Sequence, residues 1–226
     1  MRTKLVVIGL VLASSLAVAD EAADLKACNA GKGAVCVELG DRHANGTDAD
    51  KDDAKAFALY VKGCTAKTAK GCALAGAMQT RGEGVPKDEA KGLALMTKAC
   101  DLKDGGACND MGTSYSEGKN GAKQELAKAK SLYDKACTLK DGLGCFNLGN
   151  VYRVGEGVKV DLKAAFANFG KSCDFDAAKG CTELGIMYYE GSVAAPKNVN
   201  KAVEALEKAC KLGSDVACKN VALLKK

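Results

Sequence analysis

Apolar residues recur along the chain in two kinds of amphipathic segment. In the first kind, a cysteine is followed by an apolar residue after three positions, glycine after four and usually an aromatic residue after seven; one copy has Cys145, Leu148, Gly149 and Tyr152. Offsets of 0, 3, 4 and 7 lie on one stripe of an α-helix. We call this expected helix "helix A".

The second kind of segment lies before each cysteine, and we call it "helix B". Four residues before a cysteine stand Tyr60, Met96, Tyr133, Phe169 and Leu206, and eight before it stand Ala56, Gly92, Ala129, Ala165 and Ala202. These positions also share one helical stripe. The expected N-caps are Asp52, Asp88, Asp161 and Asn198, with Glu125 a weaker version. Glycine-rich stretches such as 82–86 and 155–157 separate helix A from helix B.

The helix A columns repeat along the chain. The apolar column is Leu39, Ala75, Met111, Leu148 and Leu184, followed by Gly40, Gly76, Gly112, Gly149 and Gly185. The mostly aromatic column is His43, Gln79, Tyr115, Tyr152 and Tyr188, and a second glycine follows at 46, 82, 118, 155 and 191. Glycine weakens a helix, so a regular glycine column inside helix A predicts that another helix approaches closely there.

The twelve cysteines form six pairs, each separated by eight residues, and the pairs recur every 36 or 37 residues: Cys28/Cys36, Cys64/Cys72, Cys100/Cys108, Cys137/Cys145, Cys173/Cys181 and Cys210/Cys218. Residues eight apart in one helix are about 12 Å apart, whereas a disulfide needs Cα atoms within roughly 7 Å. We therefore predict six local disulfides, each across a turn from the end of helix B to the start of the next helix A. The expected turn glycines are Gly33, Gly71, Gly105, Gly106, Gly142, Gly144, Gly180 and Gly213. Metal binding is disfavoured because there is no CxxC motif and only one histidine.

This periodicity predicts an all-α fold, an α/α superhelix (solenoid) of about five disulfide-stapled helix–turn–helix repeats. The expected repeats are 36–71, 72–107, 108–144, 145–180 and 181–217. An N-terminal half-helix at 20–35 and a C-terminal cap at 218–226 complete a single solenoid over 20–226.

The N-terminus predicts export. Arg2 and Lys4 precede an apolar stretch at 5–16, and Ala17-Val18-Ala19 resembles a cleavage site. This is the layout of a signal peptide at 1–19, and the apolar stretch is short for a membrane span. Twelve cysteines also suit an oxidising compartment. We expect a periplasmic or secreted protein with no membrane span after cleavage.

Charge and composition argue against several partners. Without Arg2 and Lys4, the 33 basic residues become 31 against 28 acidic ones, a net charge of +3. That balance gives no reason to expect nucleic acid or an anionic membrane. Trp is absent and 5% of residues are aromatic, so a platform for stacking bases is not expected. No cofactor is expected, and we expect a monomer.

The repeated motif is Cys-x-x-Leu-Gly-x-x-Tyr-x-x-Gly followed by an Asp-capped helix that ends in a cysteine, as residues 145–173 show. It resembles the Sel-like repeat (SLR), a relative of the tetratricopeptide repeat. The Cys-x7-Cys spacing is similar to that of the secreted cysteine-rich Hcp family. The resemblance implies one disulfide per hairpin. It also implies either slow penicillin-binding or β-lactamase activity, or a host- or peptide-binding scaffold. His43 and Gln79 depart from the family's aromatic position.

The enzyme alternative has little support in the residues. Ser116-Glu117-Gly118-Lys119 matches a Ser-x-x-Lys nucleophile motif, but there is no Ser-Asp-Asn, and Lys67-Thr68-Ala69 lacks the glycine of Lys-Thr-Gly. A chain this rich in lysine produces one such match by chance, and no base for Ser116 is apparent. We assign no catalytic residue. His43 is interpreted as a structural histidine and Asn45-Gly46-Thr47 as a turn.

Similarity to tetratricopeptide grooves implies that helix A offsets 1, 5, 8 and 9 from the cysteine face a ligand on a concave surface. The predicted binding residues are Asn109, Thr113, Phe146, Asn150, Arg153, Ile186 and Tyr189. Asn can pair with a peptide backbone, and Phe or Tyr can hold side chains; the alternative is an ordinary solvated face. We therefore expect a scaffold that binds a peptide, a protein or a cell-wall fragment. The alternatives are a weak β-lactam-binding protein or β-lactamase and a purely structural envelope protein.

Overall fold

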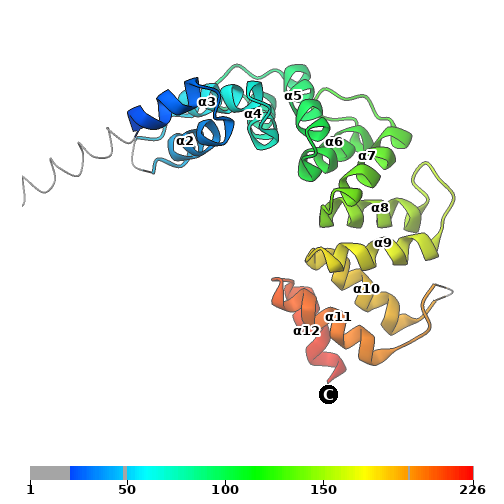
Figure 1. Ribbon diagram of the computed structural model, residues 1–226. Coiled ribbons are helices and arrows are strands. Elements are labelled where there is room, and N and C mark those ends of the chain that lie inside the picture. The colour runs from blue at the N-terminus through cyan, green and yellow to red at the C-terminus, as the bar shows by residue number, and fades with distance from the viewer. Residues whose placement is uncertain (1–20, 48–49, 193, 226) are drawn as a thin grey trace, which may run out of the picture. The chain divides into compact units, whose positions relative to one another are not determined.

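The computed structural model describes residues 21–47, 50–192 and 194–225 (Figure 1). The predicted signal peptide at 1–19 lies outside these residues. The chain divides into two compact units, one up to Leu102 and one from Lys103 onward. Over the described residues the regular structure is helical, and the predicted all-α solenoid of disulfide-stapled repeats is confirmed.

Helices A and B alternate in both units. The first unit contains a helix at 21–29, then α2 (Gly33–Asn45), α3 (Asp53–Thr65), α4 (Ala69–Arg81) and α5 (Glu89–Asp101). The second contains α6 (Gly105–Glu117), α7 (Leu126–Thr138), α8 (Gly142–Val154), α9 (Leu162–Asp174), α10 (Ala178–Glu190), α11 (Val199–Lys211) and α12 (Asp215–Leu224). The A helices are α2, α4, α6, α8 and α10, and α12 is a final A-type helix that no described helix B follows.

The glycine column inside helix A marks the closest approach between the two helices of each repeat. A Cβ atom on Gly149 would lie 2.6 Å from Cε1 of Phe169, a side chain that is fully buried. The same contact recurs between Gly40, Gly76, Gly112 and Gly185 and the side chains of Tyr60, Met96, Tyr133 and Leu206, at 2.6–2.9 Å. The prediction of close helix packing at this column is confirmed, and its partner is the residue four before the next cysteine.

Side-chain caps begin the B helices as predicted at four of the five sites. The side chains of Asp52, Asp88, Asp161 and Asn198 accept hydrogen bonds from backbone N–H groups in the first turn. Glu125 makes no such bond, because its longer side chain does not return to the backbone. Caps on A helices that the sequence analysis missed come from Asp104, Asp141 and Ser214.

A backbone hydrogen bond closes each A-to-B loop in the same way. The N–H of Asp161, the N-cap of α9, donates to the carbonyl of Tyr152 at 2.9 Å. The equivalent bonds join Asp52 to His43, Asp88 to Gln79, Glu125 to Tyr115 and Asn198 to Tyr188. The mostly aromatic column therefore also fixes, through its carbonyls, where helix B begins.

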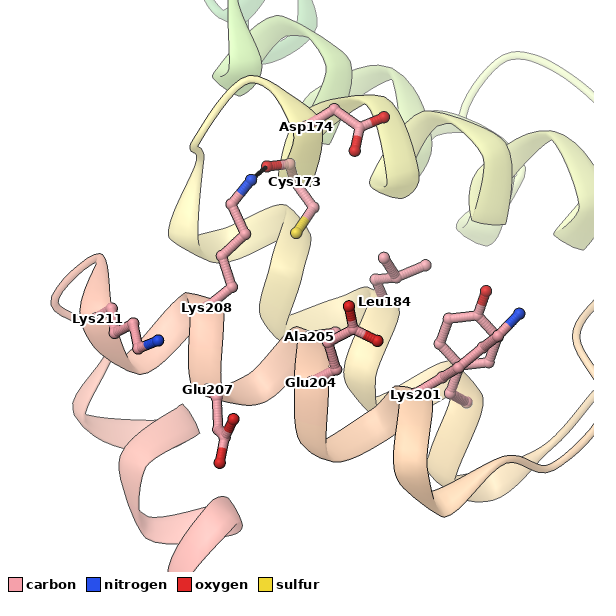
Figure 2. A pocket seen from close by; sticks show the side chains of 10 residues that line it. Cys173, Asp174, Leu184, Lys201, Glu204, Ala205, Glu207, Lys208 and Lys211 are labelled. Atoms are coloured by element: carbon pink, nitrogen blue, oxygen red, sulfur yellow. Dashed lines mark hydrogen bonds between the residues drawn. The ribbon is translucent and has the colours of Figure 1, made fainter.

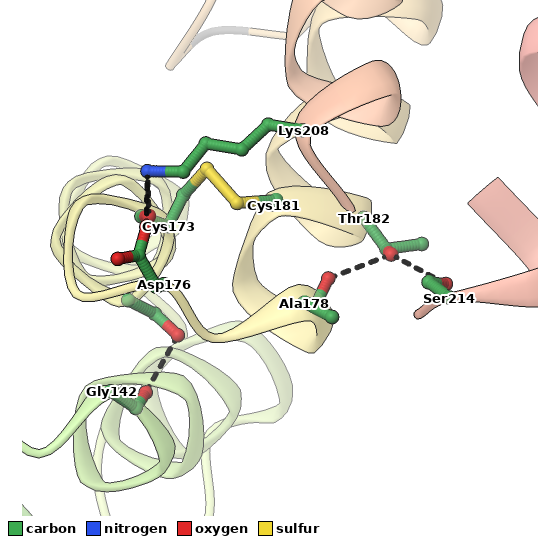
Figure 3. The surroundings of a disulfide bond; sticks show 9 residues. Gly142, Cys173, Asp176, Ala178, Cys181, Thr182, Lys208 and Ser214 are labelled. Carbon is green, nitrogen blue, oxygen red and sulfur yellow. Dashed lines mark hydrogen bonds and ion pairs between the residues drawn. A yellow bond between two sulfur atoms is a disulfide. The ribbon is translucent and has the colours of Figure 1, made fainter. Parts of the chain in front are cut away.

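Within each unit, disulfides join helix B to the helix A that follows. The predicted bridges Cys28–Cys36, Cys64–Cys72, Cys137–Cys145, Cys173–Cys181 and Cys210–Cys218 are present, with Cα–Cα distances of 4.4–4.8 Å. Cys100 and Cys108 are disulfide-bonded as well. Figure 3 shows the Cys173–Cys181 bridge, where Lys208 of the next helix B donates to the Cys173 carbonyl at 2.7 Å.

The residues that make the B-to-A turn differ from the prediction. Most of the expected turn glycines lie inside the first turn of helix A, where Gly71 and Gly144, for example, allow close contact with the preceding helix B. The turn itself uses the left-handed backbone of Gly31, Lys67, Lys103, Lys140, Asp176 and Gly213. Only Gly213 was predicted correctly. A left-handed residue at the end of a helix is usually glycine, so the lysines and the aspartate were not recognisable from sequence.

Candidate functional site

The second unit brings the predicted binding residues onto neighbouring helices. Within this unit α8 lies against both α6 and α10, whereas α7 and α9, or α9 and α11, make no comparable contact in the part that the structure describes. The A helices are therefore closer together than the B helices and lie on the inner side of the stack. We call the surface formed by offsets 1, 5, 8 and 9 of α6, α8 and α10 the "A face".

The α6 part of the A face is used mainly for packing. Asn109 is only 7% exposed, and its Oδ1 accepts a hydrogen bond from Nδ2 of Asn147 in the next repeat at 2.8 Å. Thr113 is half-buried, and its Oγ1 accepts a hydrogen bond from the hydroxyl of Tyr133 at 3.3 Å. Burial raises the pKa of Tyr133, so this hydroxyl stays protonated and able to donate. Asn109 therefore joins neighbouring repeats, and Thr113 joins the two helices of one repeat.

The α8 part offers more accessible polar groups. Oδ1 of Asn150 accepts hydrogen bonds from Nε and one terminal nitrogen of Arg153, at 3.2 and 2.8 Å. This pairing orients the exposed guanidinium and leaves other N–H groups of Arg153 available. Phe146 is half-buried against Phe169, with ring centroids 5.9 Å apart, and Lys179 lies over its ring.

The α10 part contains a pocket. A cavity of about 310 Å³ lies between α10, α11 and α12. Its lining residues are Ile186, Tyr189, Glu190, Leu206, Asn220, Leu223 and Leu224. Tyr189 is 43% exposed and Leu223 is 67% exposed. The structure thus combines two predicted residues, Ile186 and Tyr189, with α12 residues that the sequence analysis did not consider.

The only sequence signal for the α12 contribution was the apolar end of the chain, Val221 to Leu224. In the other A-type positions such residues are followed by a helix B. Among the described residues no helix B covers α12, and Leu223 is 67% exposed.

Ser116 does not show the arrangement of a Ser-x-x-Lys nucleophile. Its Oγ donates to Oε1 of Glu156 at 2.6 Å, a carboxylate in the loop of the next repeat. The ammonium of Lys119 instead pairs with Glu117 at 2.9 Å. The motif's lysine is therefore engaged elsewhere, while Glu156 is a partner that the sequence did not reveal.

His43 lies where the packing interpretation placed it. It is 3% exposed, and its Nε2 is 3.2 Å from a carboxylate oxygen of Glu21. Among the described residues no group of His, Cys, Asp and Glu has the arrangement of a metal site. Asn45 ends α2, and Gly46 follows with left-handed backbone, as expected for a turn. In the same described part, no helix has the length and apolarity needed to cross a bilayer.

The chain is similar to several solved structures, of which those with a TM-score above 0.5 have the same fold. A Sel1 repeat protein from Oxalobacter formigenes is 26% identical over 84% of this chain and 77% of its own, with a TM-score of 0.78. The cysteine-rich protein B of Helicobacter pylori is 36% identical over 59% of this chain and 94% of its own, with a TM-score of 0.48. The immunity protein Pa5087 from Pseudomonas aeruginosa is 22% identical over 82% of this chain and 68% of its own, with a TM-score of 0.55.

No curated protein matches the chain closely enough to be counted as a relative. The Sel1 repeat matches residues 34–67, 69–104, 106–141, 142–174 and 178–214, which is most of the sequence. These limits follow the A–B hairpins that the structure shows. The chain therefore belongs to the Sel1 repeat family.

Proposed function

We propose that this protein is an exported scaffold that binds a peptide, a protein or a cell-wall fragment on the A face of its second unit. The observation that carries the proposal is the cavity of about 310 Å³ that Ile186 and Tyr189 form with Leu223 and Leu224 of α12. Membership of the Sel1 repeat family, whose members are repeat scaffolds, supports the same function.

The lining suits an apolar group next to a polar one. A volume of this size is at the lower end of ligand pockets, and its floor is apolar while Glu190 and Asn220 supply polar atoms at its edge. Tyr189 offers both an apolar ring and a hydroxyl, as tyrosines at interfaces do. On the adjacent α8, the oriented guanidinium of Arg153 suits a carboxylate or a peptide carbonyl. A peptide with one apolar anchor fits this combination.

Export is supported by the disulfides. The cysteines of the described residues are all disulfide-bonded, and such bonds persist in the periplasm and outside the cell but are rare in the cytosol. An exported scaffold would meet peptides, envelope proteins and cell-wall fragments. The cysteine spacing resembles that of the secreted cysteine-rich Hcp family, and we propose that the chain belongs to that subgroup.

The test compares two exposed apolar residues of α12. Leu223 lines the pocket and is 67% exposed, whereas Val216 lies outside the lining and is 60% exposed. After capture of a ligand from envelope extracts, its affinity is measured for the wild-type protein, Leu223→Asp and Val216→Asp. We expect Leu223→Asp to weaken binding about tenfold or more, by placing a charge in an apolar pocket, and Val216→Asp to change little. Equal effects of the two substitutions, at unchanged melting temperature, would refute the proposed site.

The β-lactam alternative has a separate test. The oxidised protein is incubated with a chromogenic cephalosporin, next to Ser116→Ala. Because Lys119 pairs with Glu117 and not with Ser116, we expect no turnover that depends on Ser116. Turnover that disappears in Ser116→Ala would favour the enzyme alternative over the scaffold.

A further inference from the structure

A second cavity lies on the other side of the last complete repeat. It has a volume of about 600 Å³ and lies between α9 and α11, with α10 beneath it (Figure 2). We call it the "α9–α11 groove". Its lining residues are Cys173, Asp174, Leu184, Tyr188, Lys201, Glu204, Ala205, Glu207, Lys208 and Lys211. Leu184, Ala205 and the Tyr188 ring supply an apolar floor, and the charged residues form the walls.

Gly170 lies near this groove, and no packing contact of the fold requires a glycine there. It lies inside α9, three and four residues before the lining residues Cys173 and Asp174, and so on the same face of the helix. A Cβ atom on Gly170 would meet no other atom within 4 Å, and its backbone is not left-handed. The equivalent positions of the earlier B helices are Val61, Thr97 and Asp134. A mid-helix glycine costs about 1 kcal/mol relative to alanine, and neither packing nor backbone conformation explains it here.

Two of the three lysines that line the groove, Lys208 and Lys201, contact the protein itself, whereas Lys211 forms no hydrogen bond or ion pair among the described residues. The Lys208 ammonium donates to the Cys173 carbonyl and pairs with Asp176, at 2.7 and 2.9 Å. The Lys201 ammonium lies 5.4 Å from the centre of the Tyr188 ring. Lys225, by hydrogen bonding, and Lys211, through its charge, lower the pKa of Glu207.

Two of the three carboxylates, by contrast, face no partner. Glu204 and Asp174 form no hydrogen bond or ion pair within the described residues, and both line the groove together with Leu184. Among the lining side chains of the described residues, the unpaired charges are therefore negative at Glu204 and Asp174 and positive at Lys211, and negative charge is in excess.

We propose that the α9–α11 groove binds a basic peptide segment, with a lysine or arginine side chain paired to Glu204. The aliphatic stem of such a side chain would lie along Leu184 and Ala205, as lysine and arginine stems do on apolar surfaces. The missing side chain at Gly170 would let the peptide backbone approach α9. The volume exceeds what one small cation fills, which favours a peptide over a free polyamine. This site is on a different surface from the A face and does not depend on the function proposed there.

The test uses a fluorescently labelled octalysine peptide, whose affinity is measured by fluorescence anisotropy at physiological salt. Without the predicted signal peptide the protein carries a formal net charge of +3, so nonspecific attraction does not favour a cationic probe. Octaglutamate and fully acetylated octalysine are the control peptides, and spermidine is the competitor that represents a free polyamine.

Two substitutions locate the site. Glu204→Gln removes the charge of an exposed residue and should weaken octalysine binding about tenfold, as expected for loss of a charge-assisted contact. Gly170→Leu should fill the groove and also weaken binding, although it should raise the stability of α9 because leucine favours helices. The matched control is Asp134→Leu, the same helix position in the preceding repeat, which should leave binding unchanged.

If Gly170→Leu binds octalysine less tightly although the protein is more stable, the loss of binding does not come from unfolding. The proposal fails if octalysine does not bind, if acetylated octalysine binds equally well, or if Glu204→Gln and Gly170→Leu bind as the wild type does. Competition by spermidine as strong as that by unlabelled octalysine would assign the groove to small polycations and overturn the peptide proposal.

Discussion

Gly149→Ala tests whether close helix packing explains the glycine column. Alanine in place of glycine should stabilise helix α8 by about 1 kcal/mol through its intrinsic propensity. The new Cβ atom, however, would lie 2.6 Å from Cε1, 2.7 Å from Cδ1 and 3.2 Å from Cζ of Phe169. Phe169 is fully buried and packs against Phe146, so its ring has no open space to enter.

The expected result is a net loss of stability. Inserting a methyl group into a packed contact costs about 1–3 kcal/mol. Because this contact is so short, we expect a cost in the upper part of that range. After subtracting the propensity gain, we expect Gly149→Ala to lower the free energy of unfolding by about 1–2 kcal/mol. Gly170→Ala is the matched control, because a Cβ atom there meets nothing within 4 Å. That change should instead stabilise the protein by up to about 1 kcal/mol.

The two variants are compared by guanidinium denaturation followed by circular dichroism, with the wild type measured alongside. Repeat proteins can unfold in more than one step, so the comparison uses the midpoint of the transition that α8 and α9 share. The last A-type helix, α12, is consistent with this explanation. No described helix B follows it, and the position of the glycine column is occupied by an exposed alanine, Ala222. If Gly149→Ala stabilised the protein as much as Gly170→Ala, close approach would not be the reason for glycine.

Three further outcomes follow from the turns, the bridges and the caps. Lys140→Gly should stabilise the protein by about 1 kcal/mol, because Lys140 has left-handed backbone that costs little for glycine; an unchanged denaturation midpoint would contradict this. Reduction should lower the melting temperature strongly, because each bridge contributes about 2–4 kcal/mol; no shift would mean that packing alone holds the repeats. The backbone N–H of Lys91 holds the pKa of Asp88 below its usual value of 3.8, so this cap stabilises the fold above about pH 4 and loses its effect as pH falls through the lowered pKa. Melting curves measured at several pH values should show that the melting temperature falls less at acidic pH for Asp88→Asn than for the wild type.

Much of the fold was predictable because it is local and repeated. Cysteines eight residues apart can form a bridge only across a turn, and the five bridges whose pairing is given above have that arrangement. Aspartate and asparagine before the B helices become caps because their short side chains reach the first-turn N–H groups. The left-handed lysines were missed because a turn conformation that favours glycine can be imposed on another residue by the bridge and the helices around it.

The sequence by itself determined the repeat, the register of its helices and the positions that pack, since each depends on residues within about one period of 36. Which side chains remain free for a ligand was decided only by the tertiary structure. Asn109 and Arg153 both lie at predicted binding positions, yet Asn109 is buried against Asn147 whereas Arg153 is exposed beside Asn150. The pocket of Ile186 and Tyr189 needs Leu223 and Leu224 from the next helix, and the α9–α11 groove needs three helices. Such surfaces arise where separate repeats meet, and the pattern within one repeat does not contain them.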